Sequence, residues 1–416
     1  MKTEHDHPQD TTSDRQARIL MTWEFGGALG HLARLRPLAL RLVERGHRVH
    51  LAFRPNRYEG LIPRSLGLLP VPGHRPVRDP IAQPVNMADI LFNHGVTDRE
   101  MLAGQVRAWR GLFELVRPDV VVMDYSPIAL LALQGLAPAT LQLGTGFASP
   151  PAIDPLPGLR AWQSHYPERV QRTERSVLDS LNRQLTLQGE APLGGVGELF
   201  GRVDANLLAT FRELDHYPQR SAGSYLGTWP DLGGVSPEWP IGEGPRIFAY
   251  LKPFRQLPAL LSHLRDRGWP TLVFAKGLVE PERWTSETLM IVDRPLDMQQ
   301  VARQCDAAIL NAGHGTTAEL LLAGKPVVQV PLNVEQFHNA ANTERLGAGV
   351  HARADRVDSL CQAIDALVSR PEYAEAARAF RRRYADHDPR RRIEQVVDRI
   401  ESLAGRWAMR SRSDRE

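Results

Sequence analysis

Side chains suited to binding an anion gather in the stretch from residue 306 to residue 349. An apolar run of strand length (306–310) precedes a small-residue turn, and residues 318–323 follow with helical spacing. Glycines let the backbone approach a ligand closely, and the free amide groups at a helix N-terminus attract anions. We therefore expect a phosphate or diphosphate site, with a plain tight turn as the alternative. The candidate ligands are Asn311, Gly313, His314, Gly315, Thr316 and Thr317.

Further polar groups follow the turn and the next predicted strand, at 326–330. Glu319 lies one turn inside the helix, where a carboxylate can reach ribose hydroxyls. Glu335 and Gln336 lie in a polar segment (333–339) expected as a loop, and a carboxylate beside an amide can bind sugar hydroxyls. The alternatives are a solvated helix residue for Glu319 and a first-turn helix acid for Glu335. With the anion turn, these groups predict a pocket for a nucleotide sugar.

One lysine offers a further phosphate contact. Lys252 follows a predicted strand at 246–251, the first strand of the C-terminal half, and its ammonium could neutralise a phosphate. The alternative is an ordinary surface lysine. No HxxxH or CxxC motif and no carboxylate cluster in the sequence indicates a metal site, and no GxSxG motif indicates a serine nucleophile. We therefore expect chemistry without a metal or a resident cofactor.

A histidine and an aspartate in the N-terminal half could form a general base. His31 follows the first predicted strand (18–23) at a glycine-rich turn, and Asp124 ends the apolar strand 119–123. The carboxyl ends of parallel strands meet at one edge of a sheet, so both side chains should reach the same cleft. A histidine supported by a buried carboxylate is an effective base near neutral pH. The alternatives are helix caps, for the helix after His31 and for a helix at 126–136.

The elements that must position these groups alternate between strand and helix. The predicted strands of the N-terminal half are 18–23, 47–53, 119–123, 139–143 and 205–209. Those of the C-terminal half are 246–251, 271–275, 289–292, 306–310 and 326–330. This alternation predicts an α/β protein with two doubly wound domains and parallel sheets. Two such domains facing each other would share a cleft at the carboxyl ends of their strands.

The length of 416 residues also suits two domains. A segment rich in proline and glycine, without periodicity, separates the two alternating halves and is typical of an interdomain connection. The predicted division is a disordered tail at 1–17, a first domain at 18–215, a linker at 216–245, a second domain at 246–388, a C-terminal helix at 389–408 and a tail at 409–416.

Composition narrows the class of protein. Lysine and arginine number 51 against 48 acidic residues, giving a net charge of +3, and no interleaved basic and aromatic pattern predicts nucleic-acid binding. Cys305 and Cys361 make no disulfide framework, which favours a reducing compartment. No apolar run reaches the roughly 18–20 residues of a membrane span, and residues 1–16 lack the apolar core of a secretory signal. We therefore expect a cytoplasmic protein.

An arginine-rich segment near the C-terminus has two interpretations. One is a solvated basic face, and the other is a weak peripheral contact with an anionic membrane surface, where several basic residues act together. Its members are Arg381, Arg382, Arg383, Arg390, Arg391 and Arg392.

Two of these stretches resemble a known family. NAGHGTTAELLLAGKPVVQVPLNVEQFHNAANTERLGAG resembles the donor-binding motif of glycosyltransferase family 1, which includes UDP-glycosyltransferase-like and macrolide glycosyltransferase-like enzymes. GGALGHLARLRPLALRLVERGHRV resembles the opening Gly-His loop and helix of that family. The resemblance covers nearly the whole chain. It implies the GT-B fold: two Rossmann-like, doubly wound domains facing a cleft, with a C-terminal helix that crosses back to the N-terminal domain.

The resemblance also implies roles for individual residues. His31 matches the base that deprotonates the acceptor hydroxyl, and Asp124 matches the aspartate that supports it. Gly313, Gly315, Thr316 and Thr317 match the diphosphate loop. Glu319 matches the ribose-binding glutamate, and Glu335 and Gln336 match the pair that holds the donor sugar.

The implied reaction is direct displacement at the anomeric carbon, with inversion and without a metal. The donor would be a UDP- or TDP-linked sugar, and the acceptor a hydroxyl of a small molecule or lipid. The acceptor pocket would be built from residues 61–95 and 144–157, the least regular parts of the N-terminal half.

Three positions depart from the family pattern. Asn311 stands where the family usually has a phosphate-binding histidine. The tryptophan that stacks on the base is missing, because its position falls near Pro295. The expected Gly-Ser/Thr after the first strand of the second domain is replaced by Tyr250-Leu-Lys252-Pro. We hypothesise that Lys252 supplies the charge that Asn311 lacks.

Two other functions remain open on the same fold. One is a nucleotide-sugar epimerase or hydrolase, which would need further acid/base carboxylates in the cleft. The other is a non-catalytic partner protein that binds a nucleotide sugar, an interpretation favoured by the altered donor pocket. The presence of both His31 and Asp124 counts against the non-catalytic interpretation.

Overall fold

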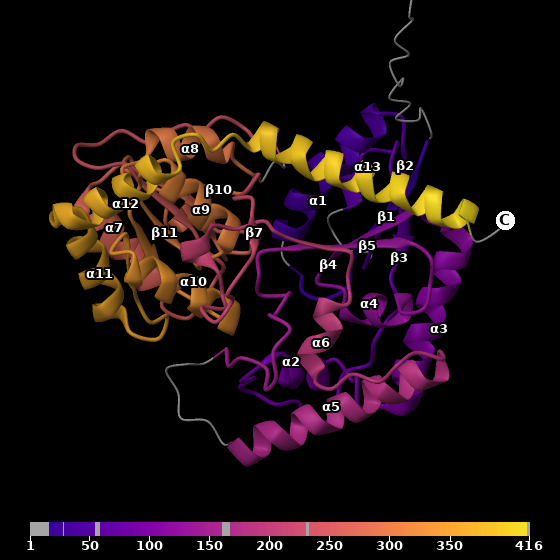
Figure 1. Cartoon of the computed structure of the whole chain (residues 1–416). Coiled ribbons are helices and arrows are strands. Elements are labelled where there is room, and N and C mark those ends of the chain that lie inside the picture. The colour runs from indigo at the N-terminus through magenta and orange to yellow at the C-terminus, as the bar shows by residue number, and fades with distance from the viewer. Residues whose placement is uncertain (1–15, 28, 55–58, 160–166, 230–232, 414–416) are drawn as a thin grey trace, which may run out of the picture.

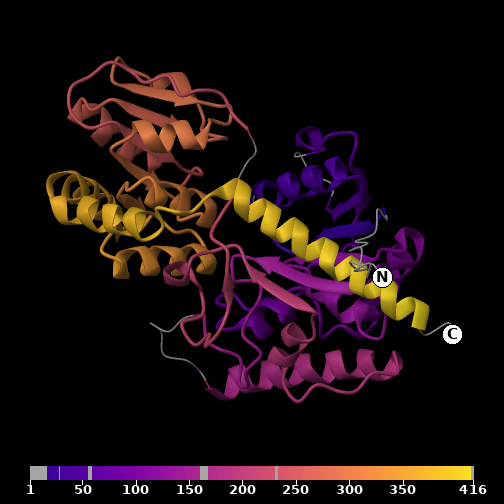
Figure 2. The ribbon, with the colours of Figure 1, turned by 45° about the horizontal axis from the view of Figure 1, so that its top comes forward.

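The computed structural model describes residues 16–27, 29–54, 59–159, 167–229 and 233–413. Two parallel β-sheets organise these residues, one in each half of the chain (Figure 1). Figure 2 shows the same two bodies from another direction, with helices packed around each sheet. This arrangement confirms the predicted α/β class with two doubly wound sheets.

The sheet of the N-terminal half has the strand order β3-β2-β1-β4-β5-β6-β7 among the described residues, and every neighbouring pair is parallel. Its strands are β1 (Arg18–Trp23), β2 (Arg48–Phe53), β3 (Gly67–Pro70), β4 (Val120–Asp124), β5 (Ala139–Gly144), β6 (Ala205–Leu208) and β7 (Ser224–Tyr225). The valine-rich β4 is buried along its whole length, as expected of a central strand covered on both faces.

Helices connect these strands. They are α1 (Leu29–Glu44), α2 (Met87–Asn93), α3 (Arg99–Val116), α4 (Pro127–Leu133), α5 (Pro167–Leu187) and α6 (Val196–Gly201), with 3₁₀ turns η1 (Glu59–Leu61) and η2 (Arg212–Leu214). Helix α1 buries leucines at helical spacing, Leu35, Leu38 and Leu42 among them. It ends before Gly46, whose φ of 88° lies in the left-handed region that favours glycine.

The sheet of the C-terminal half has the order β10-β9-β8-β11-β12-β13 in the described part of the chain and is also parallel throughout. Its strands are β8 (Ile247–Tyr250), β9 (Thr271–Phe274), β10 (Leu289–Val292), β11 (Ala307–Leu310), β12 (Val327–Gln329) and β13 (Gly349–His351). The helices are α7 (Leu257–Arg267), α8 (Met298–Gln304), α9 (His314–Leu322), α10 (Val334–Arg345), α11 (Val357–Ser369), α12 (Pro371–Arg383) and α13 (Pro389–Ser413), with η3 (Pro281–Arg283).

Strand register brings the predicted site residues to two sheet edges. Trp23 pairs with Asp124 at the carboxyl ends of β1 and β4, so the loop that follows β1 begins beside Asp124. Leu310 pairs with Tyr250 at the ends of β11 and β8, so the turns after these strands also begin together. Sequence-distant candidates therefore meet because parallel pairing aligns the ends of their strands.

Helix α13 lies along the N-terminal half although it follows the C-terminal sheet (Figure 1). Its apolar face joins the core formed by β1, β4, β5 and α1, through the buried side chains of Val396, Val397, Ile400 and Leu403. Charged contacts flank this face: Arg45 donates to Asp398 and to Glu401, each at 2.7 Å. The final helix therefore completes the first hydrophobic core.

Hydrogen bonds also join the two halves of the chain. Thr210 Oγ1, just after β6, lies 2.6 Å from His314 Nε2 at the start of α9. The side-chain amide of Asn342 donates to the carbonyl of Asp215 at 2.9 Å. His338 Nε2 contacts the carbonyl oxygen of Leu159.

Several elements differ from the sequence predictions. Residues 333–339 begin helix α10 and are not a loop, because Asn333 caps the helix by accepting from the Gln336 amide at 3.0 Å. Strand β3 lies in a region expected to be irregular, and β7 lies in the range assigned to the linker. Helix α13 continues past residue 408 to Ser413. Most of the tail predicted at 1–17, and residues 414–416, lie outside the described residues.

Candidate functional site

His31 lies in the first turn of α1, and its imidazole faces the carboxylate of Asp124. Nδ1 lies 3.0 Å from Asp124 Oδ1, within ion-pair distance, although the contact does not have hydrogen-bond geometry. The Trp23 ring stacks under the imidazole, with centroids 4.8 Å apart and planes at 20°. The structure thus brings the two residues together as their strand register predicts, and it orients the imidazole from two sides.

The other imidazole nitrogen faces a glycine. A Cβ atom at Gly26 would lie only 3.1 Å from His31 Nε2, and the φ of Gly26 is 84°. Only glycine combines this backbone conformation with an unobstructed Nε2. The nitrogen opposite Asp124 is therefore the one that a hydroxyl could approach.

Asp124 is buried and carries a second cationic neighbour. Its side chain is 1% exposed, and Oδ2 accepts a hydrogen bond from Arg34 Nη1. Burial alone would raise the pKa of Asp124, but the charges of Arg34 and His31 outweigh burial and hold that pKa below its ordinary value. Asp124 is therefore ionised near neutral pH.

The predicted anion turn forms the start of α9, directly after β11. Gly313 is the N-cap residue, and no side chain caps the helix. A Cβ at Gly313 would meet no atom within 4 Å, and Ala312 before it has a φ of 54°, which is strained for a residue other than glycine. Gly315 and Thr316 lie in the first turn of the helix. The turn thus offers uncapped amide groups beside open space.

The side chain of Asn311 forms hydrogen bonds with two backbone groups. Its Oδ1 accepts from the Lys252 amide at 2.5 Å, and its Nδ2 donates to the Val330 carbonyl at 2.8 Å. This side chain therefore ties together the ends of β8, β11 and β12, and these contacts use its oxygen and one of its two N–H donors. The Lys252 side chain is exposed beside it.

Two further members of the predicted diphosphate set turn away from the open space. The His314 imidazole is 8% exposed and contacts Thr210, and burial holds its pKa well below the ordinary value. Thr317 is buried, and its hydroxyl accepts from the Gln329 side-chain amide at 3.2 Å. Their backbone positions belong to the turn, whereas their side chains serve packing.

Glu319 lies half-buried on α9, facing α8. Burial and the nearby charge of Asp297 raise the pKa of Glu319 to about 7, although Arg303 opposes the shift. Because this pKa lies close to neutral pH, a modest change of pH alters the charge of the predicted ribose-binding group.

Glu335, in the first turn of α10, interacts with charged groups of the N-terminal half. Burial raises the pKa of Glu335, and the charges of His31 and Arg34 oppose the increase. The carboxylate is thus close enough to the His31–Asp124 pair to interact with it. Gln336 accepts from the Leu332 amide at 2.7 Å, which leaves its side-chain NH₂ to donate.

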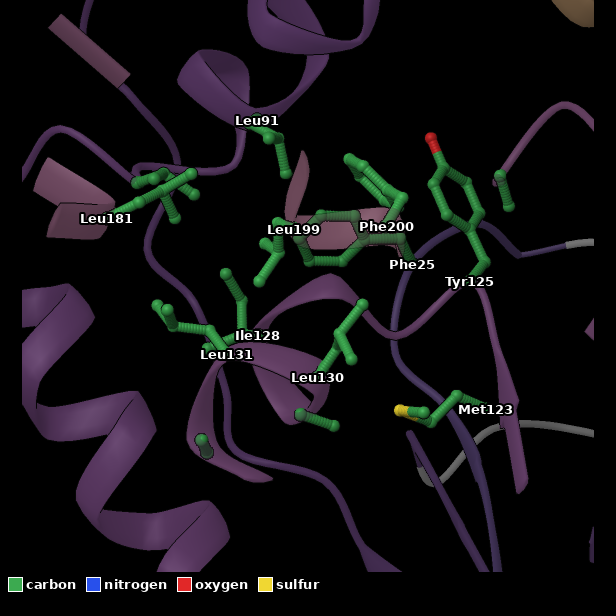
Figure 3. Close-up of a cluster of buried hydrophobic side chains, with 14 of the residues drawn as sticks. Phe25, Leu91, Met123, Tyr125, Ile128, Leu130, Leu131, Leu181, Leu199 and Phe200 are labelled. Carbon is green, nitrogen blue, oxygen red and sulfur yellow. The ribbon is translucent and has the colours of Figure 1, made fainter. Parts of the chain in front are cut away.

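Sequence reasoning missed Arg34 and Tyr125. Arg34 follows His31 by three residues, a helical spacing that places both side chains on one face and could have revealed it. Tyr125 follows Asp124 with a φ of 54° and packs edge-on against Phe25, with centroids 5.5 Å apart. Its ring lies at the margin of the apolar cluster, with the hydroxyl directed outward (Figure 3). No sequence pattern predicts this strained backbone.

The described residues contain neither a candidate metal site nor a helix that could cross a membrane. No group of three or more histidine, cysteine, aspartate or glutamate side chains in the described ranges is arranged to hold a metal ion. No helix in the described part of the chain is long and apolar enough to cross a membrane.

The C-terminal half matches a known domain family. Residues 281–390 match the model of the glycosyltransferase family 28 C-terminal domain. The matched segment contains α8, α9 and α10 and hence the predicted donor residues from Asn311 to Gln336. The match names family 28, whereas the motif in the sequence resembles family 1.

Relatives of similar length are glycosyltransferases. The chain is 28% identical over 389 residues to a PGL/p-HBAD biosynthesis glycosyltransferase of Mycobacterium tuberculosis (strain ATCC 25177 / H37Ra), covering 88% of each chain. It is 27% identical over 385 residues to a PGL/p-HBAD biosynthesis rhamnosyltransferase of Mycobacterium bovis (strain BCG / Pasteur 1173P2), covering 87% of this chain and 83% of the relative.

Solved structures share the fold. The calicheamicin glycosyltransferase CalG4 superposes with a TM-score of 0.69 at 18% identity, over 94% of this chain and 99% of that one. The glycosyltransferase VinC, solved in complex with DTDP, superposes with a TM-score of 0.66 at 17% identity, over 94% and 100%. The two parallel-sheet domains therefore form a GT-B fold, and the protein is a glycosyltransferase.

Proposed function

We propose that the protein is an inverting, metal-independent glycosyltransferase that moves a sugar from a UDP- or TDP-linked donor to a hydroxyl of a small or lipophilic acceptor. The observation that carries this proposal is the His31–Asp124 pair: the second imidazole nitrogen of His31 lies beside Gly26, and the His31 charge acts on Glu335 in the C-terminal half, which also holds an uncapped helix N-terminus. A base on one domain and an anion site on the other are the two parts that displacement at an anomeric carbon requires.

The transfer step follows from this geometry. The acceptor oxygen forms a bond to the anomeric carbon as its proton passes to His31 Nε2. The bond between the anomeric carbon and the diphosphate oxygen breaks on the opposite face, and the diphosphate leaves with the electron pair. Asp124 stabilises the imidazolium that forms. Attack from the face opposite the leaving group inverts the anomeric centre.

The donor would lie across the start of α9. Its diphosphate would contact amide groups at Gly313, Gly315 and Thr316, with the Lys252 ammonium nearby, and its ribose would contact Glu319. Glu335 and Gln336 would hold the sugar. In this proposal Asn311 acts indirectly, because its amide fixes the Lys252 backbone and the ends of three strands. The names of the relatives, which include a rhamnosyltransferase, support trying deoxyhexose donors alongside glucose.

A weak membrane contact belongs to the same proposal if the acceptor is a lipid. The basic residues at the junction of α12 and α13 are mostly exposed, whereas Arg383 pairs with Glu213. Several exposed arginines near one another would favour an anionic surface at low ionic strength.

Transfer is tested by incubating the protein with a panel of UDP- and TDP-linked sugars and of phenolic, sterol and other hydroxyl acceptors, and reading products by mass. We expect an acceptor heavier by one hexose or deoxyhexose, with the anomeric configuration opposite to that of the donor. His31→Ala should lower the rate by about 10²–10⁴-fold. His263→Ala is a matched control, because His263 forms a comparable pair with Asp365, at 3.1 Å, far along the chain on α7.

Three results would contradict the proposal. Isomerised or hydrolysed donor without acceptor product would indicate the epimerase or hydrolase alternative. Donor binding without any product would indicate a non-catalytic binding protein. An unchanged rate in His31→Ala would remove the general-base assignment.

A further inference from the structure

Arg34 is a cation of the site that no role above explains. It lies on the His31 face of α1, one helical turn further along, and its guanidinium contacts Asp124 Oδ2 while His31 contacts Oδ1. Its side chain is 12% exposed. Trp229 Nε1 donates to the Arg34 carbonyl at 3.1 Å, which holds this turn of the helix in place. One buried carboxylate is therefore shared between a titratable partner and a permanently charged one.

The charged surroundings of the pair come from four elements. Asp124 lies on β4, and Arg34 and His31 lie on α1. Glu335 on α10 is close enough for its charge to interact with both His31 and Arg34. His314 on α9 is buried within range of the Arg34 charge. The nearest rings, Trp23 and Tyr125, stack near the imidazole at 4.8 and 6.2 Å between centroids.

Without Arg34, a neutral His31 would leave the buried negative charge of Asp124 without a positive partner. A base must be unprotonated before it acts, and a buried carboxylate beside a neutral imidazole has lost its counter-charge. Such a pair can avoid this cost by holding a proton on the imidazole, and a protonated imidazole cannot accept another. A guanidinium on the second oxygen removes this problem, because it stays charged at every working pH.

We infer that Arg34 is a positioning residue that holds Asp124 ionised and oriented towards His31, and so keeps His31 available as a free base near neutral pH. This inference rests on the proposed function, in which His31 takes a proton from the acceptor. Arg34 need not contact the acceptor or the sugar. Its effect passes through the carboxylate that it shares with His31.

The consequence is a measurable shift in the pH–rate profile. Removing the guanidinium leaves an aspartate–histidine pair with no third charge, in which the imidazolium is better stabilised. The acidic limb of kcat/KM should therefore move upward by about one pH unit or more, since nearby charges of this kind shift titrations by roughly 1–3 units. For each unit that the limb moves, the rate should fall about 10-fold at pH values well below the limb and only a few-fold at pH 7.

The experiment measures kcat and KM for donor and acceptor from about pH 5 to pH 9 for the full-length protein and four variants. Arg34→Gln and Arg34→Met remove the charge, and the methionine keeps an unbranched apolar side chain in case the glutamine variant does not fold. Arg34→Lys keeps the charge. Arg107→Gln is the control, because Arg107 is an exposed arginine on another helix, α3.

We expect the acidic limb to move upward in the charge-removing variants and to stay close to wild type in Arg34→Lys and Arg107→Gln. Equal loss of rate in the Gln, Met and Lys variants, with unmoved limbs, would indicate a merely structural residue and overturn the inference. A change confined to the donor KM would make Arg34 a donor ligand, which also overturns it. If wild type shows no transfer with any donor, the proposed function fails; if wild type transfers and the limbs do not move, only the role of Arg34 fails.

Discussion

Two carboxyl groups at the cleft have opposite protonation behaviour because their neighbours differ. Asp124 is almost inaccessible, yet its pKa is lowered, because Arg34 and His31 outweigh the effect of burial. Glu319 forms no ion pair among the described residues, so burial and Asp297 raise its pKa to about 7. Neighbouring charge therefore decides the ionisation of Asp124, whereas burial is the largest influence on Glu319.

Donor affinity should depend on pH through Glu319. A carboxylate accepts two ribose hydroxyls, whereas a protonated carboxyl accepts fewer, so the donor should bind more weakly as pH falls below about 7. We expect the donor KM to rise several-fold between pH 8 and pH 6 while the acceptor KM changes little. Glu319→Gln should bind the donor weakly at both pH values. An equally steep pH dependence in that variant would show that another group is responsible.

Which candidate side chains lie together was predictable where the pairing of parallel strands decides their positions. His31 and Asp124 were found because each follows an apolar strand, and parallel pairing brings such ends together. The inward direction of His314 and Thr317 could not be predicted, because it depends on Thr210 and Gln329, which are distant in sequence. The backbone role of Asn311 was missed for the same reason.

At the scale of elements, the N-terminus of α9 is the feature on which donor binding depends. Gly313 has φ −65° and ψ 129°, which alanine adopts freely, and an added Cβ would meet open space. Gly313→Ala should therefore change the free energy of unfolding by no more than about 0.5 kcal/mol. The same methyl group would occupy the space proposed for the diphosphate, so we expect the donor KM to rise at least about 10-fold.

The matched control is Gly111→Ala on α3, where a Cβ also meets no atom within 4 Å. It should leave the donor KM unchanged and, in a helix interior, stabilise the fold slightly. A wild-type donor KM in Gly313→Ala would place the diphosphate elsewhere.

Strands made wholly of apolar residues were easier to predict than elements of mixed composition. Strand β10 has the predicted bounds, because all four of its residues are apolar. Strand β3 contains glycine and proline, and β7 has only two residues, so neither gives a strand pattern. Helix α10 begins with polar residues, and its local signals were the cap at Asn333 and the first-turn acid Glu335.

At the scale of the whole molecule, three buried histidines lie where the two halves meet. His216 follows η2, His314 begins α9, and His338 lies on α10; the His216 ring lies 6.1 and 5.8 Å from the other two rings. Burial lowers the pKa of His216 to about 3 and that of His314 well below its ordinary value. Both are therefore neutral in the folded protein at mildly acidic pH.

This junction should make the fold less stable in mild acid. Below about pH 6.5 the unfolded chain binds protons at His216 and His314 while the folded chain does not, so the free energy of unfolding falls as pH falls. The slope approaches about 1.4 kcal/mol per pH unit for each histidine, and for His216 it continues towards about pH 3. Denaturant unfolding at pH 7.5, 6.5 and 5.5 measures the decline.

His216→Phe should reduce that slope by the contribution of one histidine, since phenylalanine fills a similar volume against Phe147 and does not titrate. Phe147→Leu, which alters the ring beside His216 but removes no titratable group, is the control and should leave the slope close to wild type. If the free energy of unfolding changes with pH equally in wild type and in His216→Phe, His216 does not cause the loss of stability in acid.

The position of α13 bears on how the protein is made. Val396, Val397, Ile400 and Leu403 complete the core that contains β1 and α1, so this core cannot close until helix α13, which follows the second sheet along the chain, has been translated. Until the final helix is translated, the N-terminal half carries an uncovered apolar face, which is a site for chaperone binding or aggregation. Chains interrupted before residue 389 should therefore accumulate in insoluble form, even with the whole of the first sheet and all the residues of the proposed base already synthesised.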